Sequence, residues 1–231
     1  MIVTLKALSA LLSYPGAELQ QVAPEIAAML GEETLLSAVR IDDLAPLLGE
    51  LAGHDLFDLQ ERFVHLFDRS RTLSLNLFEH VHGDSRARGS AMVDLLETYR
   101  AAGLEPVGPE LPDHLPILLE YLSQRPLAEG RDTLADAAHI FVALAERLDR
   151  RRSSYAAVFR ALADLAATSA SAELIAEAAA TPDDDPDDLE ALDAVWEEAT
   201  VTFGPDPNAA CPAGRDILAR MAPPPLAPRG N

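Results

Sequence analysis

Helical periodicity is the feature that most limits how this chain can fold. Apolar residues recur at three- and four-residue intervals, whereas the alternation typical of a half-buried strand is nearly absent. Prolines and glycines separate the periodic stretches. The pattern predicts an all-α fold with helices at about 2–13, 16–30, 33–52, 55–68, 73–82, 84–102, 114–123, 131–150, 153–168, 171–180 and 188–200.

Most of these helices are predicted to form one domain, because no change in composition divides them. Alanine and leucine dominate both halves of the chain before residue 180, and no repeat of fixed period stands out. A chain of 231 residues is long enough to bury one sizeable core. We therefore predict a single helical bundle of about ten helices over residues 1–180.

The C-terminal part of the chain differs in its chemistry. Nine acidic residues and no basic residue lie between Pro182 and Glu198, so like charges should extend the chain there. We predict an acidic linker with a short amphipathic helix at 181–204. A disordered, proline- and glycine-rich tail is predicted at 205–231.

Charge and cysteine content narrow the classes of function. The net charge of −20 argues against nucleic-acid binding and against stable association with anionic membranes, and it favours a cationic partner. The single cysteine, Cys211, excludes an intramolecular disulfide and suits a reducing compartment. Lys6 interrupts the apolar start, so it is no signal peptide, and no stretch approaches the roughly 20 apolar residues of a membrane helix. We predict a cytoplasmic protein.

The run from Glu110 to Leu122 predicts a capped amphipathic helix. With Asp113 as the N-cap, Pro116 falls at the third helical position, where its missing amide hydrogen leaves no intrahelical bond unmade. Four leucines then follow at the spacing of a buried stripe: Leu115, Leu118, Leu119 and Leu122. An ordinary capped helix explains this pattern by itself.

The same run gathers polar side chains beside its apolar stripe. Asp113 and Glu120 lie seven residues apart and share another side of the helix, with His114 next to the first of them. Glu110, in the segment before the helix, is near enough to fold back toward them. The sequence therefore predicts an acidic rim with one imidazole along an apolar surface.

Aromatic and histidine residues concentrate between residues 59 and 82. We predict that Phe63 and Phe67 belong to the core. His80 and His82 are two residues apart, which places their rings roughly 160° apart on a helix and makes a shared metal ion unfavourable. A metal-dependent hydrolase remains an alternative, with these candidate residues: His65, His80, His82 and Asp84.

Catalytic motifs give no support to an enzyme. The sequence has no Gly-x-Ser-x-Gly motif, no glycine-rich phosphate loop and no dinucleotide-binding fingerprint.

The one basic cluster of the sequence, Arg147 to Arg152, lies at a predicted helix C-terminus, where cations are favoured by the helix dipole. We predict a structural role for this cluster, with a recognition patch as the alternative.

Motifs spread over about residues 8–204 carry a family resemblance. They are Leu11-Leu12-x-Tyr14-Pro15, Phe67-Asp68-Arg69-Ser70-Arg71, Ser74-Leu75-x-Leu77-Phe78-Glu79-His80-Val81-His82-Gly83-Asp84-Ser85-Arg86, Arg88-Gly89-x-Ala91-Met92-Val93-Asp94-Leu95, Glu110-Leu111-Pro112-Asp113-His114-Leu115-Pro116, and Trp196-Glu197-Glu198 with Val201-Thr202-Phe203. Together they resemble the TorD/DmsD/NarJ redox-enzyme maturation chaperones, and within them the NarJ group of nitrate reductase assembly chaperones. The sequence departs from the group at Ala87, often an acid, and at Ser90, often glutamine.

The resemblance implies an all-helical, cofactor-free cytoplasmic chaperone rather than an enzyme. Its client would be the α subunit of respiratory nitrate reductase. The chaperone would bind the N-terminal segment of that subunit and keep it competent for insertion of the molybdenum cofactor, bis-MGD, before membrane anchoring. Proteins of molybdenum cofactor biosynthesis are further expected partners.

By the same resemblance, the peptide-binding residues are Glu110, Asp113, His114, Glu120, Phe78, Glu79 and His80. We expect an amphipathic client helix to dock in an apolar groove, which supplies the affinity, while the acidic residues select a cationic feature. A general protein–protein adaptor without a metalloenzyme client is the alternative.

Overall fold

The computed structural model describes residues 1–184 except 83–85, 169 and 181, and the side chains of residues 82, 86 and 87 are not described. Every described residue belongs to one compact unit of the chain, Met1–Asp188. The helix predicted at 188–200 and the tail predicted at 205–231 therefore lie outside the described residues.

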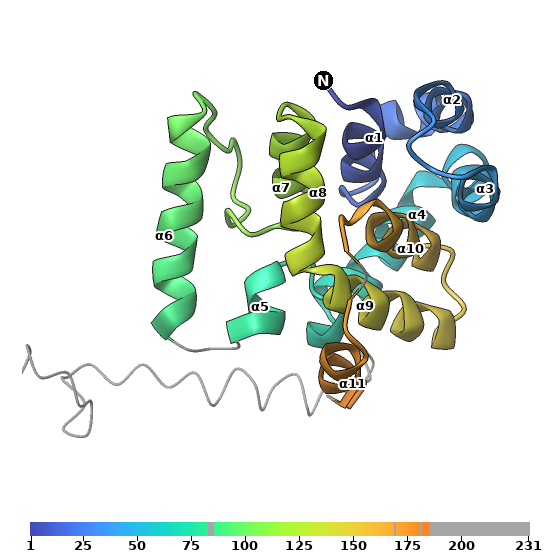
Figure 1. Cartoon of the computed structure of the whole chain (residues 1–231). Coiled ribbons are helices and arrows are strands. Elements are labelled where there is room, and N and C mark those ends of the chain that lie inside the picture. The colour runs from blue at the N-terminus through green and yellow to red at the C-terminus, as the bar shows by residue number, and fades with distance from the viewer. Residues whose placement is uncertain (83–85, 169, 181, 185–231) are drawn as a thin grey trace, which may run out of the picture. The chain divides into compact units, whose positions relative to one another are not determined.

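Helices make up the described part of the chain, which contains no β-strand and so confirms the all-α prediction (Figure 1). Between the α-helices are a π-helical turn, η1, and a 3-10 turn, η2. The elements in order are α1 (Val3–Leu11), α2 (Ala17–Glu33), α3 (Ala38–Gly53), α4 (Leu56–Phe63), η1 (Val64–Asp68), η2 (Arg71–Leu73), α5 (Leu77–His82), α6 (Arg86–Ala101), α7 (Leu115–Ser123), α8 (Leu127–Asp136), α9 (Ala138–Arg150), α10 (Ala156–Leu165) and α11 (Ala172–Ala180).

The helix predicted at 131–150 is wrong, because two helices occupy this stretch. α8 begins after its N-cap Pro126 and ends at Asp136, and α9 begins at Ala138. The residue between them, Ala137, has φ −101° and ψ 1°, outside the helical range. Neither glycine nor proline marks this break, so the sequence offered no local signal for it.

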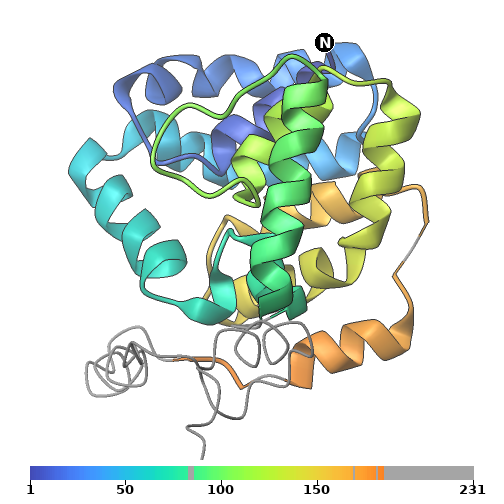
Figure 2. The same cartoon turned by 90° about the vertical axis from the view of Figure 1, so that its left-hand side faces the viewer.

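The core is built around α1, which packs against both α7 and α2. The other close helix pairs are α2 with α3 and α9 with α10. Figure 2 shows α6 in front of these helices and α11 along their lower edge. The predicted leucine stripe of α7 is buried as expected, with Leu115 and Leu119 fully removed from solvent.

The aromatic residues of α4 and η1 belong to this core, as predicted. Phe63 and Phe67 are each 4% exposed, and their ring centroids lie 4.9 Å apart. Both rings also contact the fully buried Tyr155, which precedes α10. Burial raises the pKa of the Tyr155 phenol to about 12. Among the described helices, none combines the length and the apolar character required to cross a membrane.

Candidate functional site

The segments that precede α5 and α7 meet in a short antiparallel bridge between Asn76 and His114. The amide of Leu77 donates to the carbonyl of Asp113 at 3.1 Å, and the amide of Leu115 donates to the carbonyl of Leu75 at 2.8 Å. The bridge places the start of α5 beside the start of α7. It thereby brings together two of the stretches that the sequence singled out.

Asp113 does not cap α7, so the predicted N-cap is wrong. The N-cap of α7 is His114, whose side chain makes no capping bond, and Pro116 occupies the second helical position rather than the third. The side chain of Asp113 is fully buried, and its Oδ2 accepts from the amide of Phe78 in the first turn of α5 at 3.0 Å. Asp113 therefore caps α5, a distant helix that the bridge brings next to it.

Arg88 of α6 lies close to two carboxylates. Its Nη2 is 2.9 Å from Oε1 of Glu79 and 3.9 Å from Oδ2 of Asp113. Oδ1 of Asp113 has no hydrogen-bond partner among the described residues. The hydroxyl of Tyr99 donates to the carbonyl of Pro112 at 2.9 Å and holds the same segment to α6. Since a buried carboxylate requires a compensating charge, Arg88 and Asp113 fix the start of α5 together.

His114 is half-buried among acidic groups. Desolvation lowers the pKa of its imidazole, and the nearby Glu110, Asp113 and Asp68 oppose that effect. Desolvation also raises the pKa of the Asp68 carboxyl, and Glu110 raises it further. Glu110 is thus near enough to affect the pKa of both His114 and Asp68.

The acidic rim predicted along α7 is not formed. Asp113 is buried, whereas Glu120 is exposed and pairs with Lys6 of α1. Glu120 lines a separate hollow of about 320 Å³ together with Tyr99 and Tyr121. The two carboxylates therefore do not lie on one surface of α7. Asp113 precedes the N-cap of α7, His114, so it does not follow the helical spacing that the sequence suggested.

A larger hollow of about 670 Å³ lies beside α5, and we call it the α5–α9 groove. Its apolar lining includes Phe78 of α5 and Ile140 of α9, and its acidic lining includes Glu79 and Glu177. The full lining is Arg71, Thr72, Phe78, Glu79, His80, Val81, Asp136, His139, Ile140, Ala143, Arg147, Leu174, Glu177 and Ala178. Three predicted peptide-binding residues, Phe78, Glu79 and His80, therefore line one groove. Asp113 holds the first turn of the helix that carries them.

His80 is fixed in one tautomer within this groove. Its Nε2 lies 2.8 Å from the carbonyl oxygen of Ser74. Because a carbonyl only accepts, this nitrogen carries the proton. Desolvation lowers the pKa of the imidazole more than the hydrogen bond to Ser74 and the neighbouring carboxylates raise it. His80 is therefore neutral at pH 7 and presents its Nδ1 as an acceptor.

The basic cluster at the end of α9 holds other parts of the chain in place. Arg147 is 3% exposed, and its guanidinium donates to the carbonyls of Thr72 at 3.3 Å and Ala178 at 2.7 Å. Arg151 binds the carboxylates of Asp183 at 2.8 Å and Asp184 at 3.0 Å. The role of the cluster is structural, as predicted, but local sequence pattern does not indicate that the acidic segment is its partner.

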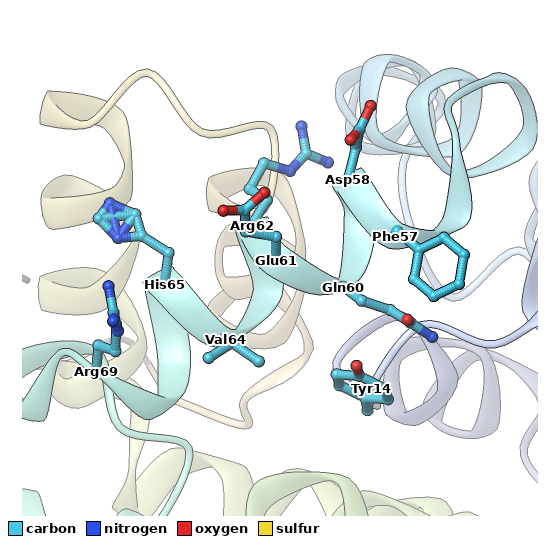
Figure 3. A pocket seen from close by; sticks show the side chains of 9 residues that line it. All are labelled: Tyr14, Phe57, Asp58, Gln60, Glu61, Arg62, Val64, His65 and Arg69. Carbon is cyan, nitrogen blue, oxygen red and sulfur yellow. The ribbon is translucent and has the colours of Figure 1, made fainter.

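A third hollow, of about 750 Å³, runs along α4 and η1 (Figure 3). Phe57 and Tyr14 lie on one side of it and are 79% and 56% exposed. The lining is Tyr14, Phe57, Asp58, Gln60, Glu61, Arg62, Val64, His65 and Arg69. It contains none of the predicted peptide-binding residues, so the α5–α9 groove is the better candidate site.

Of the four residues of the alternative hydrolase site, the two whose side chains are described, His65 and His80, line different hollows. His65 lines the hollow along α4, whereas His80 lines the α5–α9 groove. Within the described part of the chain, no three His, Cys, Asp or Glu residues are grouped so that they could hold a metal ion. The side chain of His82 and all of Asp84 lie outside that part.

Comparisons with known proteins match the chain over most of its length. The family model of the nitrate reductase delta subunit matches residues 17–161. The chain is 44% identical over 205 residues to the nitrate reductase molybdenum cofactor assembly chaperone NarJ of Escherichia coli K12, covering 89% of this chain and 86% of that protein. Identity is 40% over 211 residues to the "Probable nitrate reductase molybdenum cofactor assembly chaperone NarW" of the same strain, covering 90% and 86%.

A crystal structure supports the same fold. A redox enzyme maturation protein from Archaeoglobus fulgidus superposes with a TM-score of 0.50 at 24% sequence identity. The match covers 70% of this chain and 90% of that one. At this level of identity, the likeness concerns the helical fold alone.

Proposed function

The chain belongs to the nitrate reductase delta subunit family, and on this basis we propose that it is an assembly chaperone for a respiratory nitrate reductase. The resemblance inferred from its motifs is thereby confirmed at the level of the family. Such a protein binds a client and performs no catalytic step of its own. We further propose that it acts in the cytoplasm and meets proteins of molybdenum cofactor biosynthesis there.

The proposed client segment is the N-terminus of the reductase α subunit, bound as an amphipathic helix in the α5–α9 groove. The observation that carries this proposal is the position of Phe78, Glu79 and His80 in the lining of one groove. Phe78 offers apolar area, Glu79 attracts a cationic side chain, and Nδ1 of His80 accepts a hydrogen bond. This is the helix-in-groove mode of peptide recognition.

The predicted binding residues take different roles in this proposal. Asp113 is a positioning residue, because its buried carboxylate holds the amide of Phe78 and lies near Arg88. Glu110 and His114 are not in the groove lining, and in this proposal they contact the cationic side of the client where it extends beyond the groove. Glu120 is set apart beside Lys6 and is not part of the groove.

The expected affinity is moderate. Burial of about 500 Å² of apolar surface contributes on the order of 12 kcal/mol at ~25 cal/mol per Å². Lost freedom of the two molecules and ordering of the peptide oppose this by about 4–15 kcal/mol. Binding is therefore reversible, which suits a client that must be released once its cofactor is inserted.

Calorimetry tests the proposal. The full-length chain is titrated with a synthetic peptide of the α-subunit N-terminus and with a scrambled peptide of the same composition. The native peptide should bind at least tenfold more tightly than the scrambled peptide, which is a difference of about 1.4 kcal/mol in binding free energy. Equal affinities would favour the general adaptor instead.

A further inference from the structure

Helix α11 forms part of the wall of the α5–α9 groove. Leu174, Glu177 and Ala178 of α11 belong to the lining of the groove, and α11 packs against α9 (Figure 1). No residue of α11 is buried, and Leu174 is 45% exposed. The helix thus forms part of the groove wall with little burial of its own side chains.

The position of α11 depends on polar contacts at its ends. A helix of nine residues is too short to be stable by itself in water. Near its end, the guanidinium of Arg147 donates to the carbonyl of Ala178 at 2.7 Å, which places a cation where the helix dipole favours it. At its start, the hydroxyl of Ser171 accepts from the amide of Leu174 at 3.2 Å.

Asp184 fastens the chain just beyond α11. Its carboxylate accepts from the hydroxyl of Ser70 at 2.6 Å, from the amide of Arg71 at 2.6 Å, and from the hydroxyl and the amide of Thr72. Arg151 completes the set at 3.0 Å. Desolvation raises the pKa of the Asp184 carboxyl, but the hydrogen bonds from Ser70, Thr72 and Arg71 outweigh it and lower that pKa. The carboxylate is therefore charged at neutral pH.

We propose that α11 and Asp184 form a latched cover over the α5–α9 groove, which a helical client segment displaces. The inference rests on the proposed function, because it concerns access to the same groove. α11 itself indicates what the groove accepts: a short helix rich in small side chains whose last carbonyls meet Arg147. A client helix with cationic side chains would be attracted to Glu79 and Asp136. The acidic helix α11 has no such attraction to these carboxylates.

The latch sets the fraction of molecules that are open to the client. If the covered state is favoured by about ten to one, the apparent dissociation constant is about tenfold weaker than that of the open state. Loss of the latch removes this factor without changing any residue that contacts the peptide. The effect on affinity is therefore opposite in sign to that of damage to the groove.

Asp184→Asn in the full-length chain tests the cover. The matched control is Glu173→Gln, which removes a carboxylate from the exposed side of α11 and leaves the latch intact. The dissociation constant of the α-subunit N-terminal peptide should fall by up to about tenfold in Asp184→Asn and by less than about twofold in the control. Adding Ser70→Ala to Asp184→Asn should change little more, because the two residues share one hydrogen bond.

Amide hydrogen exchange over residues 172–180 gives a readout that does not depend on affinity. Exchange should be faster in Asp184→Asn without peptide, and faster in the unchanged chain once peptide is added. Unchanged exchange and affinity in Asp184→Asn would overturn the cover while leaving the proposed function intact. Faster exchange with weaker binding would also overturn it, since α11 would then assist the peptide. No binding to either chain would overturn the proposed function, and the role of the cover with it.

Discussion

The carboxylate of Asp113 accepts a hydrogen bond from the backbone amide of Phe78, 35 residues away in the sequence, at 3.0 Å. The carbonyl of Asp113 also accepts from the amide of Leu77, so one residue satisfies the first two amides of α5. These bonds connect the start of α7 to the groove. They explain how a residue without access to solvent controls the position of a candidate binding surface.

The burial of Asp113 leads to a prediction about stability. Asp113→Ala leaves the Phe78 amide unsatisfied, and such a group costs about 1–3 kcal/mol of the free energy of unfolding. Glu120→Gln is the control, because Glu120 belongs to an exposed pair with Lys6 and should change stability by less than about 1 kcal/mol. Urea denaturation of both variants measures the difference. Equal midpoints would mean that the amide finds another acceptor.

The α5–α9 groove and the hollow along α4 lead to a prediction about where the client binds. Phe78→Ala should weaken binding of the α-subunit peptide by about tenfold or more, because an aromatic side chain in a groove is a typical anchor. Phe57→Ala is the control, since Phe57 is an exposed aromatic residue in the hollow of Figure 3. Calorimetry should find less than about twofold change for it. The reverse order of effects would move the client site to the hollow along α4.

His80 leads to a prediction about stability and pH. Its folded-state pKa lies below the unfolded value of 6.5, so the unfolded chain takes up a proton first as the pH falls. The contribution of His80 to stability is complete above pH 6.5 and is lost as the pH falls through the folded pKa. His80→Gln keeps a donor for the Ser74 carbonyl and does not titrate. Urea midpoints between pH 7.5 and 5.5 should therefore fall less steeply in the variant, and parallel curves would contradict this role.

The sequence predicted the features that depend on local pattern. The helical fold, the buried leucine stripe of α7 and the core positions of Phe63 and Phe67 follow from periodicity, and the structure has all of them. The break at Ala137 was missed because apolar periodicity continues across it without glycine or proline. Local pattern therefore gave the helices but not every boundary between them.

The features that join distant segments were not predictable from local pattern. Asp113 was predicted to cap α7, but the bridge between Asn76 and His114 places its carboxylate at the start of α5 instead. In the sequence, Asp184 belongs to a run of acidic residues that should repel one another. In the structure, its carboxylate accepts from the Ser70 hydroxyl and the Arg71 amide, more than 110 residues away. Such contacts depend on the packed fold, and a single sequence does not display them.

His114 leads to a prediction about peptide binding and pH. Its imidazole becomes charged only below its ordinary range, because desolvation lowers its pKa. A protonated His114 would repel a cationic client and neutralise the adjoining Glu110, so affinity should be higher at pH 7.5 than at pH 5, below the ordinary imidazole pKa. His114→Gln should flatten this dependence, whereas Glu110→Gln should weaken binding at both pH values and retain a slope. Calorimetry at the two pH values decides the matter: identical slopes for His114→Gln and the unchanged chain would show that His114 does not contact the client.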